Sequence, residues 1–350
     1  MLRIGHAILH VFDFESGSTF FSERELNLDN HQTRSYVTRR LRRIRSSAES
    51  KHGTFAPKSN FASGLKEYLA GQVPFVDFSV QIAQWFWEEL RRAEDLEQCD
   101  LLVADFTDTG EMRASENADE DTVADAYESE GMRLFAVMLL PRKQAFIHEV
   151  DENGNEIARQ DATLPNPTQK VDTYVLIDAD TLAIDFHDKE RSVAGESRQI
   201  IPELFLQCSQ EASSHEVIDE VTSIVEDLSE EYGLTPAVEV SRAKAALARR
   251  ADTDEAIQPA DVGLEVFEDN PEMAQRFEER TRERDLPEEV PVRRGAANRL
   301  TRTHRIRTDT GVEIAFPSEL AERPGYIEFT HQEDGSISIV ISNVAHIENR

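Results

Sequence analysis

Two continuous apolar runs of strand length constrain the fold of this chain more than any other feature. They cover residues 100–106 and 133–140, and their length and continuity predict two strands. Another pair of strands is predicted at residues 171–177 and 181–186, around Asp178-Ala-Asp180. Successive strands with short connections predict a largely antiparallel sheet.

A hairpin and an opening strand belong to the same pattern. Residues 144–150 and 156–159 flank residues 151–155, whose Asn-Gly pair is a strong signal for a hairpin turn. The apolar segment from Leu2 to Phe14 predicts one strand or a pair of short strands at the start of the chain.

Apolar residues at helical spacing predict a layer of helices packed beside these strands. The first helix is expected from about residue 31 to 50, with Asn30 as its N-cap. Its core-facing stripe is Val37, Leu41, Ile44 and Ala48. Two further helices are predicted, one over about residues 60–69 and one after Pro74.

The second half of the chain becomes helical and then returns to β structure. Helices are predicted around residues 217–228 and 237–251. The acidic segment 252–292 carries four prolines and is interpreted as a linker to a last unit. Strands of that unit are predicted at residues 311–316, 326–330 and 337–341.

These elements predict an α+β protein, and a length of 350 residues favours two domains or one large domain with an appendage. We expect an N-terminal α+β domain with a largely antiparallel sheet and packed helices at residues 1–191. A helical middle region with an acidic linker follows at residues 192–292, and a small C-terminal β unit follows at residues 293–350.

The chain is strongly acidic, with 68 Asp and Glu residues against 38 Lys and Arg residues and a formal net charge of -30. Such a charge repels a polyanion on average, which argues against DNA wrapping over the whole surface. The segment 107–131 is predicted to be an acidic, solvated loop.

Location follows from what the sequence lacks. No apolar run approaches the roughly 20 residues that a membrane-spanning helix needs. The first residues carry His6, His10 and Asp13 in place of a secretion signal. The two cysteines, Cys99 and Cys208, form no CxxC pair, so we expect a cytoplasmic protein without a membrane partner.

Common catalytic motifs are also missing: the sequence has no GxGxxG, no GxxxxGKS/T, no HExxH and no GxSxG. We therefore predict no catalytic residue, no cofactor and no metal site. The most metal-like group is Asp178, Asp180, Asp185, His187 and Asp188. In a strand-turn-strand setting the first two aspartates are turn formers, and a divalent-metal nuclease site there is an alternative.

A basic cluster on the first predicted helix is the first candidate for nucleic-acid binding. It consists of Arg34, Arg39, Arg40, Arg42, Arg43 and Arg45, with Lys51 just beyond the helix. At about 100° per residue, Arg39, Arg42 and Arg43 project opposite the apolar stripe. These guanidinium groups could contact phosphates, or they could pair with the carboxylates of the protein itself.

A second basic cluster precedes the C-terminal strands. It consists of Arg293, Arg294, Arg299, Arg302, Arg305 and Arg307. Thr301, Thr303 and His304 add donors that could bind phosphate. The structural alternative is a flexible arm, or an edge strand that its charge protects from aggregation.

The order of segments resembles the 37-kilodalton nucleoid-associated bacterial protein family. The segments that carry the resemblance are Ala7-Ile-Leu-His10, Phe78–Leu90, Leu101–Phe106, Asp172–Asp185, Gly311–Leu320 and Tyr326–Phe329. The resemblance implies a nucleoid location and association with DNA, and it transfers no active-site residue.

We therefore expect a non-catalytic nucleoid-associated protein whose Arg clusters meet DNA while its acidic exterior limits nonspecific condensation. One alternative is an adaptor whose acidic loop meets the basic surface of a DNA-processing enzyme. Another is a metal-dependent nuclease, for example in phage defence. The expected partners are DNA, such a DNA-processing enzyme and a second copy of the chain in a homodimer.

Overall fold

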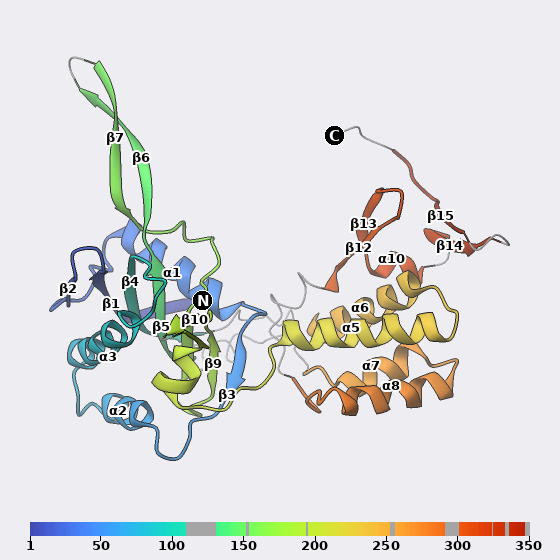
Figure 1. The fold of residues 1–350 in the computed structure, drawn as a ribbon, viewed down its shortest axis with the longest axis horizontal. Helices are drawn as coiled ribbons and strands as arrows, with labels where there is room; N and C mark the ends of the chain where they lie inside the picture. Colours follow the sequence, from blue (N-terminus) through green and yellow to red (C-terminus); the bar gives the residue numbers. More distant parts are fainter. Residues whose placement is uncertain are drawn as a thin grey trace, which may run out of the picture. The chain divides into compact units, whose positions relative to one another are not determined.

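The structure, a computed structural model, describes residues 1–109, 131–151, 154–193, 195–252, 256–290, 301–323, 325–332 and 336–346. The chain divides into two compact units (Figure 1): the first comprises Met1–Arg45 and Ser50–Gln210, and the second comprises Ser46–Glu49 and Glu211–Arg350. Most of the predicted acidic loop, residues 110–130, lies outside the described residues.

An antiparallel sheet forms the core of the first unit, as the apolar runs predict. Its strands are β1 (Leu2–Asp13), β2 (Ser18–Phe20), β3 (Lys51–Gly53), β4 (Cys99–Asp108), β5 (Met132–Pro141), β8 (Tyr174–Asp178) and β9 (Ile184–His187). The strand order is β2-β1-β4-β5-β8-β9-β3, and all neighbours are antiparallel. The predicted α+β fold with an antiparallel sheet is confirmed.

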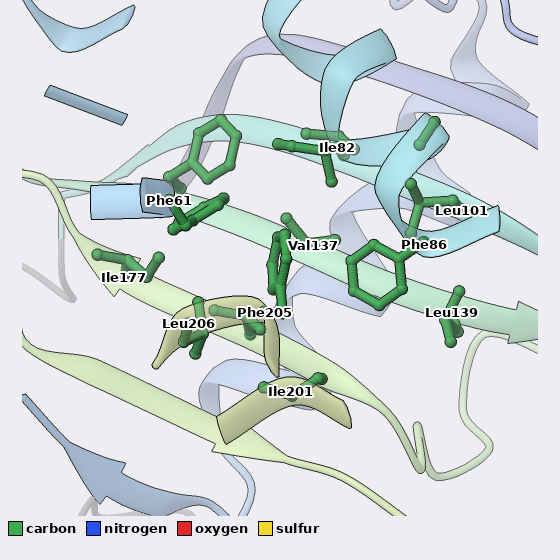
Figure 2. Packing of buried hydrophobic residues seen from close by; sticks show 14 of the residues in the cluster. Phe61, Ile82, Phe86, Leu101, Val137, Leu139, Ile177, Ile201, Phe205 and Leu206 are labelled. Carbon is green, nitrogen blue, oxygen red and sulfur yellow. The ribbon is translucent and has the colours of Figure 1, made fainter. Parts of the chain in front are cut away.

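Helices cover both faces of this sheet. The helix α1 (His31–Arg45) packs on one face. The helices α2 (Asn60–Leu69) and α3 (Phe75–Leu90) and the short π-helix η1 (Ile201–Leu206) pack on the other. Figure 2 shows Phe205 of η1 beside Val137 of β5 on this second face. Because alternate side chains of β4 and β5 enter two separate cores, these strands are apolar on both faces.

The helix α1 ends at Arg45, earlier than the predicted residue 50. After it, Ser47 Oγ accepts a hydrogen bond from the amide N–H of Glu49 at 3.3 Å. A serine side chain that bonds to the nearby backbone competes with helical hydrogen bonding. Ala48, predicted as the end of the apolar stripe, therefore lies beyond the helix.

Two hairpins accompany the sheet of the first unit. The predicted hairpin forms from β6 (Lys143–Asp151) and β7 (Gly154–Thr163). A shorter one, which the sequence pattern did not indicate, forms from β10 (Arg191–Val193) and β11 (Glu196–Arg198).

The second unit is built on the helices α5 (Ser214–Glu231), α6 (Pro236–Asp252), α7 (Pro259–Val266) and α8 (Pro271–Glu283). The expected linker at residues 252–292 thus contains two helices. Each of them has proline in its first turn. Backbone N–H groups in the first turn have no partner within the helix, so the lack of an N–H in proline costs no hydrogen bond there. Val262, Met273 and Phe277 of these helices are buried in the core of the unit.

Small β hairpins end the described chain, as predicted. The strand β12 (Thr303–Arg307) pairs with β13 (Glu313–Pro317), and β14 (Ile327–His331) pairs with β15 (Ile337–Ile341). The short helix α10 (Glu319–Glu322) lies between the hairpins in sequence. None of the helices in the described part of the chain combines the length and the apolar character that a membrane span requires.

Candidate nucleic-acid interface

The helix α1 has an apolar side and a basic side. Asn30 caps its N-terminus, because the side-chain Oδ1 accepts the amide N–H of Gln32 at 2.8 Å. The side chains buried against the sheet include Val37, Leu41 and Ile44. The apolar stripe therefore fixes the rotation of the helix and decides which arginines reach solvent.

Four arginines of α1 reach solvent without a carboxylate partner in the described chain. Arg34, Arg39 and Arg42 are exposed, and Arg43 is half-buried. Arg34 donates a long hydrogen bond of 3.5 Å to the carbonyl oxygen of Leu28. Among the described residues, no Asp or Glu forms an ion pair with any of these four.

Many other arginines are paired with the protein's own carboxylates. Just after α8, Arg284 lies 2.7 Å from both Glu220 and Asp227. Further paired arginines are Arg91, Arg92, Arg133, Arg142, Arg191, Arg198, Arg242, Arg249, Arg250, Arg276, Arg280 and Arg282. The outward face of α1 departs from this pattern.

Arg40 differs from its neighbours because its side chain is fully buried, at 0% exposure. Its guanidinium donates to the carbonyl oxygens of Pro165 at 2.8 Å and Gln169 at 3.0 Å, and to the Tyr36 hydroxyl at 3.2 Å. Arg40 thus holds the segment that follows β7 onto α1. The helical spacing indicates that this position faces the sheet, since Arg40 lies four residues before the buried Ile44, but it does not identify the partners of Arg40.

The last two residues of the cluster are also engaged. Arg45 Nε lies 3.3 Å from Asp108 Oδ2, at the end of β4. Lys51 is the first residue of β3, where it is half-buried and pairs in register with Phe186. The structure therefore separates Arg34, Arg39, Arg42 and Arg43, which have no carboxylate partner in the described chain, from three residues with packing or pairing roles.

Only part of the second cluster can be placed, because Arg293, Arg294 and Arg299 lie outside the described residues. Arg302, Arg305 and Arg307 are exposed. The latter two share the outer face of β12, where Arg307 Nε lies 3.9 Å from Glu313 Oε1. This cluster belongs to the second unit, whereas α1 belongs to the first.

Two of the additional phosphate donors expected beside this cluster face inward. Thr301 is 0% exposed and His304 is 5% exposed. Burial, and to a lesser degree the charge of Lys244, lower the pKa of His304 to about 4. The ring is therefore neutral at pH 7 and adds no positive charge.

Comparison with known proteins decides the family. A family model described as nucleoid-associated protein YejK matches residues 8–349. The chain belongs to this family. The match spans nearly the whole chain, so the family covers both units and confirms the resemblance inferred from the sequence. No curated protein matches the chain with significant similarity. Membership makes the chain a nucleoid-associated protein and implies DNA as a partner.

The YejK family gives no indication of catalysis. In this member, the side chain of Asp178, the last residue of β8, has a role in the turn that leads to β9. Asp178 Oδ1 accepts the amide N–H groups of Asp180 and Thr181, both at 2.9 Å. This arrangement closes the turn between the two strands, as expected of aspartates at such positions.

The remaining members of the metal-like group are engaged separately. Asp185 Oδ1 lies 2.6 Å from His52 Nδ1, and the buried Asp188 lies 2.7 Å from Arg191. Burial raises the pKa of Asp188, although Arg191 opposes that shift. Within the part of the chain that the structure describes, no three His, Cys, Asp or Glu side chains are grouped to hold a metal ion.

Proposed function

We propose that this nucleoid-associated protein contacts DNA directly through four arginines of α1, namely the exposed Arg34, Arg39 and Arg42 and the half-buried Arg43. The observation that carries the proposal is their lack of carboxylate partners in the described chain of a protein with a net charge of -30. Where carboxylates outnumber cations, a solvent-exposed group of arginines left for another ligand favours an anionic partner.

The spacing of these arginines supports the same conclusion. Arg39 lies three residues before Arg42 and four before Arg43, so the three charges are neighbours on one side of the helix. Each like-charge pair at this spacing destabilises a helix by about 0.2–0.5 kcal/mol. The helix dipole offsets this for the last turn, which includes Arg42 and Arg43, but not for Arg39. DNA phosphates would neutralise all three.

The exposed Arg302, Arg305 and Arg307 form a second, separate candidate surface in the second unit. Arg293, Arg294 and Arg299 precede them in sequence and extend the same proposal. In this proposal the positive charge is confined to two small surfaces. The acidic exterior then limits nonspecific condensation, since the rest of the protein repels the phosphate backbone.

The deciding experiment is a DNA-binding titration across salt with charge-matched variants. The test variant replaces Arg39, Arg42 and Arg43 by Gln. The control replaces Arg91, Arg92 and Arg282 by Gln, which removes the same charge from arginines that pair with a glutamate three or four residues earlier in the chain. Because both variants have the same net charge, a difference between them reports local contacts.

The test variant should bind DNA more weakly and with a shallower salt dependence, while the control should resemble the wild type. Each phosphate contact contributes about 0.9 to the slope of log K against log salt, so losing three should reduce the slope by about 3. Equal slopes for the two variants would remove α1 from the interface. Failure of the pure wild-type protein to bind any DNA would favour the adaptor alternative.

A further inference from the structure

A pocket lined by aromatic rings lies between α2, α3 and η1, on the face of the sheet opposite α1. It has a volume of about 220 Å³. Figure 2 shows Phe61, Ile82 and Phe205, which these three elements contribute to its wall. We call it the aromatic pocket. The described residues that line it carry no charge, and they are Asn60, Phe61, Gly64, Phe78, Gln81, Ile82, Trp85, Leu204, Phe205 and Gln207.

The rings of the wall are in contact with one another. The ring centroid of Phe205 lies 4.5 Å from that of Phe61 and 4.7 Å from that of Trp85. Aromatic rings pair favourably at centroid separations of about 4.5–7 Å, so this wall favours a further ring as its ligand. A cavity of about 150 Å³ lined by Leu, Ile and Phe binds benzene. The aromatic pocket is larger, and it has room for the ring of a Phe or Trp side chain.

Side-chain amides surround the mouth of the aromatic pocket. Asn60, Gln81 and Gln207 are exposed, and their side chains form no hydrogen bond with any described residue. Each amide offers a donor and an acceptor, which match the C=O and N–H groups of a polypeptide backbone. Gln207 also adopts a left-handed conformation, with φ 53°, directly after the π-helix η1. Both features are concentrated at functional sites.

The charged residues beside the aromatic pocket include three exposed carboxylates. Glu67 lies three residues after Gly64 on α2, and Asp77 lies four residues before Gln81 on α3. Each is therefore a surface neighbour of a lining residue. Glu203 lies in η1. None of these carboxylates forms an ion pair with another residue in the described chain, so all three are free to meet a cation from outside.

We propose that the aromatic pocket binds an aromatic side chain of a partner protein, carried on a basic polypeptide segment. The ring enters the pocket, the amides at the mouth bind the backbone of the segment, and its Lys or Arg residues meet Glu67, Asp77 and Glu203. Charge complementarity selects this occupant. DNA would place phosphates beside these carboxylates, and a second copy of the chain would add another net charge of -30.

Selection from a library of random peptides displayed on phage tests the proposal with the full chain. The blocked variant is Gln81→Phe, which fills the mouth of the pocket from an exposed position on α3. The matched control is Gln32→Phe, at an exposed position of α1 on the opposite face of the sheet. The wild type and the control should enrich the same peptides, with an aromatic residue beside Lys or Arg. The blocked variant should not enrich them.

The affinity of one enriched peptide can be measured with a tryptophan in the wall. The chain contains two tryptophans, so Trp87→Phe leaves Trp85 as the reporter. Adding Gln81→Phe should weaken binding by about 30-fold or more, as expected for loss of a buried anchor. Replacing the aromatic residue of the peptide by Ala should cause a similar loss. The two losses should not add, because both remove the same contact.

The charges are tested by replacing Glu67 by Gln and Asp77 by Asn together. Binding of the peptide should weaken by about 3-fold to 10-fold, and its salt dependence should become shallower, because exposed ion pairs are weak and screened. The matched control replaces Glu23 by Gln and Asp29 by Asn, two exposed carboxylates of the same unit that do not line the pocket. It should bind the peptide like the wild type.

Four results would overturn the proposal. The wild type could enrich no peptide over the Gln81→Phe variant, or the enriched peptides could lack an aromatic residue or be acidic. Loss of DNA binding in that variant would assign the pocket to DNA, and a changed sedimentation coefficient would assign it to a second copy of the chain. The peptide assays contain no DNA, so they succeed or fail independently of the proposed contact between α1 and DNA.

Discussion

Replacing Arg40 by Ala should destabilise the first unit strongly, whereas replacing the adjacent Arg39 should not. Arg40 is buried and donates to the carbonyl oxygens of Pro165 and Gln169, while Arg39 is exposed on the same helix. The two substitutions remove the same side chain from neighbouring positions. They therefore compare a packing role with a surface role directly.

The expected magnitude follows from the contacts of Arg40. A hydrogen bond from a charged donor contributes about 1.5–3 kcal/mol, and two such bonds reach backbone carbonyls. Removing the side chain also leaves a cavity beneath the helix. The substitution also removes an unfavourable contribution, because the wild-type protein must desolvate a buried cation that has no carboxylate partner among the described residues. This gain offsets part of the lost stability. We expect a net loss of about 2–4 kcal/mol, against less than about 0.5 kcal/mol for Arg39→Ala.

Urea unfolding followed by tryptophan fluorescence isolates the relevant unit. The chain contains two tryptophans, Trp85 and Trp87, and both lie on α3 in the first unit. With a slope of about 2 kcal/mol/M, a loss of 3 kcal/mol lowers the urea midpoint by about 1.5 M. Equal midpoints for the two variants would refute the assignment of Arg40 to the fold.

Two further predictions concern the second unit. In α7, Gly263→Ala should destabilise the protein by about 1–3 kcal/mol, because the new Cβ would lie 2.1 Å from Phe277 Cδ1. This clash should outweigh the higher helix propensity of alanine. A raised melting temperature, measured by circular dichroism, would contradict this prediction. For His304, the pKa is about 4 in the folded protein and 6.5 unfolded, so the unfolded chain binds more protons between these values. The contribution of His304 to the free energy of unfolding should therefore be constant above pH 6.5 and fall by up to about 3 kcal/mol toward pH 4. His304→Leu should remove this loss in urea titrations at both pH values. An unchanged pH dependence in the variant would contradict the prediction.

Local patterns were sufficient for most of the secondary structure. The apolar runs at 100–106 and 133–140 became β4 and β5, and the predicted hairpin formed from β6 and β7. The linker prediction for residues 252–292 was incomplete because proline has two local roles. It ends helices from within, yet it is favoured in their first turn, and Pro259 and Pro271 occupy that place.

The basic helix shows what the sequence determined about the candidate interface and what it left open. Helical spacing alone placed Val37, Leu41 and Ile44 inward and Arg39 and Arg42 outward, because this periodicity is a property of the helix itself. It could not assign Arg40, whose role depends on carbonyl oxygens 125 and 129 residues away along the chain. Nor could it show that the outward arginines lack carboxylate partners in the described chain while many others have them. Hydrogen bonds and ion pairs between distant segments form only when tertiary packing brings them together, so that distinction belongs to the structure.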